Sequence, residues 1–187
     1  LDRLESRIIV GSRCTKLHEV AESVEKKIQH EANDVVRGVQ LLTMDAKGRV
    51  ALPAKHREKL IGHSEGQLVA TIDPQWRCLL IYPLPEWEVI EKQIQSLSMI
   101  KPETRRVQRL LIGYATDMEF AGSGRVLLAP SLREYASLSR EEKVVLVGQG
   151  KRMELWAESV WQQEQEQWLN EEQDSSALAE ELASISF

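Results

Sequence analysis

An internal repeat constrains the fold of this chain more than any other feature of its 187 residues. The run Gly48-Arg49-Val50 recurs as Gly124-Arg125-Val126, and each run stands shortly before a proline, Pro53 or Pro130. We align the two prolines by allowing one extra residue in the second copy. The agreement continues downstream in the same order, which indicates duplication of one structural unit rather than chance similarity.

The downstream part of each copy predicts two strands and the start of a helix. Apolar strands are expected at 67–72 and 143–147, each followed by a strand that ends on an aromatic residue. Tyr82 precedes Trp87 by the same interval that separates Trp156 from Trp161. These side chains and Trp76 could pack in a core or stack on bases, and their repeat-equivalent positions favour packing.

Two helices are expected between the copies. Pro85 opens the first and Pro102 opens the second, because proline is favoured in the first turn of a helix. Each helix has one apolar side at helical spacing, formed by Trp87, Ile90, Ile94 and Leu97 in the first and by Val107, Leu110, Leu111 and Tyr114 in the second. We therefore predict a first repeat at 39–84, a helical linker at 85–114 and a second repeat at 115–158.

The two ends of the chain differ from the repeats. Residues 1–34 match neither copy, although Val20, Val24 and Ile28 predict an amphipathic helix near 16–31. We interpret 1–34 as an extension outside the repeats that precedes the natural start of the protein. Residues 159–187 are acidic and rich in glutamine, and they predict a helix that continues into a tail.

The net charge of −5 is unusual for a nucleic-acid-binding protein, but the charge is unevenly distributed. Residues 158–187 contain eight acidic residues and no Lys or Arg, whereas residues 35–157 contain 18 basic and 14 acidic residues. The central part of the chain is therefore mildly basic. Such an excess supports contact with nucleic acid if it is clustered on one face. No apolar run is long enough to span a membrane, so no membrane partner is expected.

The turn before the first proline combines residues with distinct structural roles. Asp45 can accept hydrogen bonds from backbone N–H groups of the turn, and Gly48 can adopt a positive φ. Pro53 has no N–H, so it ends the strand and can open a short helix over 54–60. The basic residues around this hairpin are either DNA contacts or a solvated surface in which Arg49 pairs with Asp45; they are Lys47, Arg49, Lys55, Arg57 and Lys59.

The string Asp45-Ala46-Lys47-Gly48-Arg49-Val50-Ala51-Leu52-Pro53 resembles the half-motif of the AbrB-type swapped-hairpin DNA-binding proteins. The second copy, the basic linker helix around Arg105-Arg106 and the segment from Tyr82 to Trp87 extend the match, and the chain resembles the MraZ family from about residue 35 onward. The family's usual opening, Met-Phe-Arg-Gly, corresponds here to Val35-Val36-Arg37-Gly38. The resemblance therefore marks Val35 as a natural start and adds Arg37 to the DNA-binding candidates.

The resemblance implies an α+β fold in which tandem swapped-hairpin half-motifs interleave as one pseudo-twofold β module. It also implies a cytoplasmic, nucleoid-associated regulator of the cell-division and cell-wall gene cluster, which forms rings and binds repeated promoter boxes of double-stranded DNA without a cofactor. The DNA-binding candidates are then Lys47, Arg49, Lys55, Arg57, Arg37 and Arg125. The structural residues of the motif are Asp45, Gly48, Pro53, Gly124 and Pro130.

The second copy departs from the family pattern at one position. Ala121 stands where the family's second motif usually has Asp, so the acidic partner of Arg125 is missing at that position. We therefore expect Arg49 to contribute more to DNA affinity than Arg125.

Other candidate sites have less support. Arg105, Arg106 and Arg109 are more typical of a solvated helix face or a subunit contact than of DNA binding. His56, His63, Cys14 and Cys78 lack the spacing of metal ligands. No nucleophile–base pair, P-loop or dinucleotide motif occurs, so neither an enzyme nor a small-molecule substrate is expected. The rival hypothesis is an antitoxin-like scaffold of the same fold that binds a protein, but basic residues grouped at a hairpin favour DNA.

Overall fold

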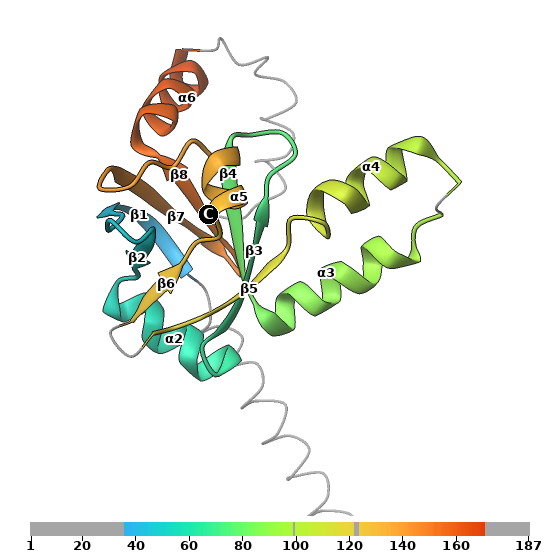
Figure 1. Ribbon diagram of the computed structural model, residues 1–187, viewed down its shortest axis with the longest axis horizontal. Coiled ribbons are helices and arrows are strands. Elements are labelled where there is room, and N and C mark those ends of the chain that lie inside the picture. The colour runs from blue at the N-terminus through green and yellow to red at the C-terminus, as the bar shows by residue number, and fades with distance from the viewer. Residues whose placement is uncertain (1–35, 99, 122–123, 171–187) are drawn as a thin grey trace, which may run out of the picture.

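The computed structural model describes residues 36–98, 100–121 and 124–170, so the helix expected at 16–31, Val35 and residues 171–187 lie outside the described residues. The larger of two antiparallel sheets contains, in spatial order, β1 (Val36–Thr43), β7 (Lys143–Gly150), β8 (Met153–Ala157), β4 (Cys78–Pro83), β3 (Gln67–Ile72) and β5 (Thr116–Glu119) (Figure 1). The smaller sheet is a ribbon of β2 (Arg49–Ala51) and β6 (Arg125–Leu127). The helices are α2 (Ala54–Ser64), α3 (Leu84–Ser96), α4 (Pro102–Leu111), α5 (Pro130–Tyr135) and α6 (Glu158–Asn170). The prediction of a mixed α+β fold with a C-terminal helix is confirmed.

The strands of the two repeat copies interleave. In the described part of the chain, β1 pairs with β7, β2 with β6, β3 with β5 and β4 with β8, and each of these pairs joins the first copy to the second. Pairing within one copy occurs in the hairpins β3–β4 and β7–β8 and in two isolated bridges, Met44 with Val50 and Ala121 with Arg125. The predicted interleaving is therefore confirmed, because most of the backbone pairing connects the two copies.

The inner face of the large sheet forms the main core. Buried side chains such as Leu68, Ile81 and Leu146 pack there with Leu60 from α2 and Leu132 from α5. The ribbon closes this core, since Val50 and Val126 are buried in the same cluster. One hydrophobic core is thus shared by both copies, by the ribbon and by the two short helices that follow it.

The outer face of the sheet is covered by helices at two separate places. Tyr82 packs against Trp87 of α3, with ring centroids 5.8 Å apart, and Trp156 packs against Trp161 of α6 at 5.6 Å. The two pairs are equivalent in the repeat. Because Tyr82, Trp87 and Trp156 are buried, they are core residues, as their spacing predicted. Trp76 and Trp168 join the second group.

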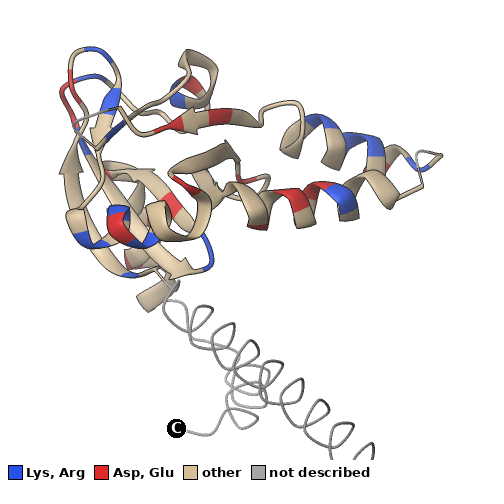
Figure 2. Ribbon diagram, turned by 90° about the horizontal axis from the view of Figure 1, so that it is seen from below, with Lys and Arg blue, Asp and Glu red and all other residues tan. Residues whose placement is uncertain are grey.

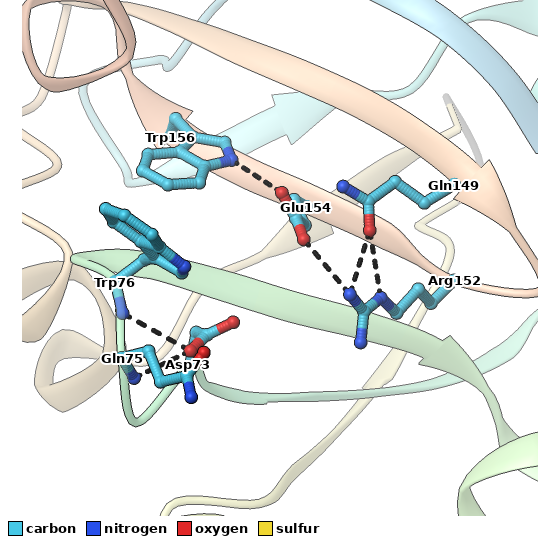
Figure 3. A network of polar contacts seen from close by, with 7 residues as sticks. All are labelled: Asp73, Gln75, Trp76, Gln149, Arg152, Glu154 and Trp156. Atoms are coloured by element: carbon cyan, nitrogen blue, oxygen red, sulfur yellow. Dashed lines mark hydrogen bonds and ion pairs between the residues drawn. The ribbon is translucent and has the colours of Figure 1, made fainter. Parts of the chain in front are cut away.

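Near these aromatic residues, the outer face carries polar side chains (Figure 3). Glu154 is buried, and its carboxylate accepts hydrogen bonds from Trp156 Nε1 at 3.0 Å and from Arg152 at 3.4 Å. Burial raises the pKa of Glu154, while the hydrogen bond from Trp156 opposes this change. Arg152 also donates to Gln149, which holds the turn between β7 and β8. In the turn between β3 and β4, the Asp73 carboxylate accepts the backbone N–H of Gln75 at 2.8 Å.

Strand β1 lies at one edge of the sheet, and its alternating apolar side chains Val39 and Leu41 lie on the outer face. Val39 lies opposite Val147, and Leu41 lies opposite Val145, so these side chains share the outer face. Val145 and Val147 are buried, whereas Val39 and Leu41 are more than half exposed. The alternating apolar residues of this strand therefore extend the outer face rather than the core.

Helix α4 begins at Pro102, as predicted, whereas α3 begins at Leu84, one residue before Pro85, which lies in its first turn. The two helices project from the sheet as an arm (Figure 1). No helix among the described residues has the length and apolar character needed to cross a membrane.

Leucines on neighbouring strands provide a test of this architecture. Leu146→Ala should lower the free energy of unfolding by about 2–5 kcal/mol, because Leu146 is 0% exposed and its truncation leaves a cavity. Leu41→Ala, the same substitution at a residue that is 51% exposed, should cost less than about 1 kcal/mol. Denaturation in urea, followed by circular dichroism, measures both values. Equal losses would contradict the assignment of the two sheet faces.

Candidate nucleic-acid interface

Two equivalent turns lead into the ribbon. In the first copy, the N–H of Asp45 donates to the carbonyl of Arg49 at 2.8 Å, and the N–H of Ala121 donates to the carbonyl of Arg125 at the same distance in the second. The turns are also cross-linked, because Leu52 N donates to the Gly124 carbonyl and Leu128 N donates to the Gly48 carbonyl. The local pairing thus brings the two Gly-Arg-Val runs side by side.

Asp45 organises the first turn. Its Oδ1 accepts the N–H groups of Lys47 at 2.9 Å and Arg49 at 3.0 Å, and its Oδ2 accepts Arg49 Nε at 2.7 Å. The hydrogen bond from the Arg49 backbone is the main reason why the pKa of Asp45 lies below its usual value. The carboxylate therefore stays charged at neutral pH and orients the Arg49 side chain.

Asp45 also supplies the acidic partner that the second copy lacks. Arg125 Nη1 lies 3.7 Å from Asp45 Oδ2, which also accepts Arg49 Nε. The missing carboxylate at Ala121 is thus replaced by one from the other copy. The expectation that Ala121 leaves Arg125 without its local acid holds for that position, but the ribbon provides a partner that sequence spacing could not reveal.

The structure corrects the alignment of the two prolines. Pro53 caps the N-terminus of α2 with φ −57° and ψ 143°, and the equivalent residue before α5 is Ala129, with φ −58° and ψ 145°. Pro130 is instead the first residue of α5, so the second copy contains no extra residue here. Without a gap, Arg57 is equivalent to Arg133, and buried His56 is equivalent to buried Leu132.

The two equivalent arginines each reach the turn of the other copy. A Cβ at Gly48 would lie 2.9 Å from Arg133 Nε, and a Cβ at Gly124 would overlap the Arg57 side chain. Both glycines have positive φ, 77° and 70°. Glycine is therefore required at both positions for two reasons: the backbone has a positive φ, and the arginine side chain occupies the space that a Cβ would fill.

The remaining basic candidates lie in two places. Lys47 lines a surface depression of about 440 Å³ together with Arg133 and Arg140. Lys55 and Lys59 on α2 surround His56, whose pKa is lowered mainly by burial and further by these two charges. The backbone of Arg37 contacts His56 from β1 and opposes that shift. Arg57 links α2 to the second turn, where it lines another depression with Gly124 and Ala121.

Several residues considered from the sequence lie away from the turns. Arg105, Arg106 and Arg109 are on α4 in the arm. His63 faces Glu86 on α3, with Nε2 3.5 Å from Oε1, and the thiol of Cys78 is buried. Among the described residues, no group of three or more His, Cys, Asp or Glu side chains is arranged to hold a metal ion.

Arg133 and Arg140 are the basic residues near the turns that sequence reasoning missed. Aligning Pro53 with Pro130 moved Arg133 out of register with Arg57. An alignment without a gap would have found Arg133, whereas Arg140 gives no motif signal.

Comparisons with known proteins show which family the chain belongs to. Residues 35–110 and 111–184 each match the family model described as MraZ protein, antitoxin-like. The chain is 50% identical over 150 residues to a protein of Halorhodospira halophila, covering 80% of this chain and 97% of that protein. It is 50% identical over 151 residues to one from Coxiella burnetii and 46% identical over 151 residues to one from Salmonella newport, covering 80% of this chain and 98% of each relative. All three relatives carry the name transcriptional regulator MraZ. The chain therefore belongs to the MraZ family and contains two copies of its domain.

Proposed function

We propose that this protein is a sequence-specific transcriptional regulator that contacts double-stranded DNA through its paired turns. The observation that carries the proposal is the meeting of Arg49 and Arg125 at Asp45, on a two-stranded ribbon flanked by further basic side chains. A ribbon of this kind fits the major groove, where arginine can read base edges. Lys47, Lys55, Arg57 and Arg37 supply contacts to phosphates. The names of the relatives support this role.

The β module is, in this proposal, a one-chain version of the AbrB-like swapped hairpin. The half-motifs are residues 39–84 and 115–158, the linker is 85–114, and 159–187 form an acidic C-terminal helix and tail. The crossed pairing of β1 with β7 and of β2 with β6 supports this assignment. One chain then completes a module that otherwise requires two.

The regulator acts as a ring-shaped homo-oligomer on repeated promoter boxes of the cell-division and cell-wall gene cluster, in the cytoplasm and at the nucleoid. The mild positive charge of residues 35–157 supports the oligomer, since one subunit offers few phosphate contacts. Several subunits on one DNA gain affinity by avidity.

An antitoxin-like scaffold that binds a protein is the second candidate function, because the family description includes the word antitoxin-like. The arginines at Asp45 favour DNA, since a scaffold has no need for basic side chains grouped at the turns. A gel shift with the DNA upstream of the protein's own gene separates the two functions.

Arginine substitutions test the roles of the two turns. Arg49→Ala should weaken binding to DNA by about 1–3 kcal/mol, because Asp45 orients this side chain through a 2.7 Å hydrogen bond. Arg125→Ala should weaken it less, since its ion pair is longer, at 3.7 Å. Fluorescence anisotropy measures the affinities, and thermal denaturation checks that each variant folds. Equal losses in folded variants would show that the turns are equivalent.

The salt dependence of binding tests the phosphate contacts. Affinity should fall steeply with salt, with a slope of log K against log salt of roughly −0.9 for each phosphate contacted. Titrations at several potassium chloride concentrations give this slope. An affinity independent of salt would remove the role proposed for the basic side chains.

The number of boxes on the probe tests the oligomer. Cutting a probe from several boxes to one should reduce affinity by about 10²–10⁴, because linked subunits bind at a high effective concentration. Mass photometry and gel shifts report the species and their affinities. Equal affinity for both probes, with a monomer in solution, would leave a single-site DNA-binding protein.

A further inference from the structure

A pocket of about 440 Å³ lies where the arm of α3 and α4 meets the sheet. Its apolar wall is formed by Leu80, Tyr82, Trp87, Ile90, Val107 and Leu111. The turn between β3 and β4 and the turn between β7 and β8 supply its polar end, and none of the described ribbon residues lines it. Pockets that hold small organic molecules measure roughly 300–1,000 Å³, with mostly apolar walls and a few polar groups. The size and the walls of this pocket are therefore those of a small-molecule site.

The two repeat copies differ in what surrounds their equivalent aromatic pairs. In the second copy, Trp168 packs against both members of the pair, with its ring centroid 5.9 Å from Trp156 and 5.7 Å from Trp161. In the first copy, Tyr82 and Trp87 contact each other, and among the described residues no third ring packs against either. Both line the pocket instead. The first copy therefore has an open space beside its aromatic pair, where an apolar group from outside can pack.

Asp73 stands at the polar end of the pocket with one carboxylate oxygen available. The residue is 9% exposed, and its Oδ1 accepts the N–H groups of Gln75 at 2.8 Å and Trp76 at 3.3 Å. Figure 3 shows the other oxygen pointing away from these N–H groups, and no described residue donates a hydrogen bond to it. The hydroxyl of Tyr135 donates to the backbone carbonyl of Asp73 at 2.7 Å and holds the residue in place. A nearly buried carboxylate in this state is ready to accept a donor from a ligand.

The other polar groups at this end of the pocket favour a positively charged ligand. Arg152 lies 3.4 Å from the carboxylate of Glu154, so its charge is compensated within the sheet. Helix α4 ends at Leu111, whose carbonyl accepts the hydroxyl of Thr71 at 2.6 Å, and the C-terminal end of a helix carries a partial negative charge. The carboxylate of Asp73 adds a full negative charge that no described cation pairs with. The polar end is therefore suited to a cation rather than to an anion.

We propose that this pocket binds a small organic amine, whose apolar body packs against Tyr82 and Trp87 and whose ammonium group donates to Asp73 Oδ2. The ammonium offers three donors, and the faces of the two aromatic rings attract its charge. Such a ligand contacts the sheet and the arm at once, because Leu111 of α4 lines the same pocket. The site is independent of the proposed DNA interface, since none of the described residues of β2 or β6 contributes to it.

Titration calorimetry of the full chain with three related probes tests the chemistry of the ligand. 2-Phenylethylamine, which is protonated at neutral pH, should bind saturably with one molecule per chain. 3-Phenylpropionate has the same ring but carries a carboxylate, and ethylamine has the same ammonium group but lacks the ring. Each of these two should bind at least about tenfold more weakly, because a hydrogen bond to a charged group and the burial of a ring each contribute a factor of that order.

Variants of the pocket test where the amine lies. Val107→Trp fills the apolar wall and should abolish binding, whereas Val89→Trp makes the same substitution at a residue of α3 that is 53% exposed and should leave binding unchanged. Asp73→Asn keeps an acceptor for the N–H of Gln75 but removes the charge, and should weaken binding about 10–100-fold. Circular dichroism checks that each variant folds. Ile90→Phe fills the same wall and replaces Val107→Trp if that variant is unfolded.

Other results would overturn the proposal. A parent chain that shows no saturable binding of 2-phenylethylamine would exclude an amine site here, and tighter binding of 3-phenylpropionate would place an anion beside Arg152 instead. Unchanged affinity in a folded Asp73→Asn variant would exclude the contact between the ammonium and this carboxylate. Unchanged affinity in a folded variant with a filled pocket would place the amine elsewhere. The titrations contain no DNA, so a failure of the proposed function in the gel shift leaves their result intact.

Discussion

Backbone hydrogen bonds that cross between the repeat copies hold this molecule together. Leu52 donates to the turn of the second copy at 3.3 Å, and Leu128 donates to the turn of the first copy at 3.1 Å. The pairing of β1 with β7 and of β4 with β8 also joins the first copy to the second. Because buried backbone groups must be paired, each copy depends on the other for its native strand pairing. The site depends on this exchange, since it places Arg49 and Arg125 on the same carboxylate.

The shared carboxylate sets the electrostatics of the turns. Asp45 holds two backbone amides and one guanidinium by hydrogen bonds, and it lies near a second guanidinium. One negative charge thus faces two positive ones, and Arg133 and Arg57 each lie against a neighbouring turn. The ribbon keeps a positive excess because the second copy contributes Ala121 in place of another acid. The positive charge of the ribbon and the geometry of its turns therefore both support this surface as the candidate nucleic-acid interface. Figure 2 shows how the charged residues are distributed over the molecule.

Much of this arrangement could be predicted from the sequence, because the signals are local. Each half-motif of the repeat is short, and the prolines in the first turns of α3 and α4 and the spaced aromatic residues also act within a few positions of the chain. The equivalence of Ala129 with Pro53 was missed because alanine can adopt the same N-cap angles as proline, so the two positions match in structure but not in residue type. The contact between Arg125 and Asp45 was missed because it joins distant residues, and the outward direction of Val39 depends on the helices that cover its neighbours. Long-range packing determines these features, and the periodicity of the sequence carries no information about long-range packing.

A single chain that holds both half-motifs can make them unequal. In a dimer of identical chains, any substitution changes both hairpins, so the binding surface stays symmetric and suits a site with its own twofold symmetry. Here Asp45 has no counterpart at Ala121, and the two halves of the ribbon differ in charge. In the proposed function, a surface of this kind has a polarity along the duplex. It then distinguishes one orientation of a box from the reverse, so that successive copies on one promoter all face the same way.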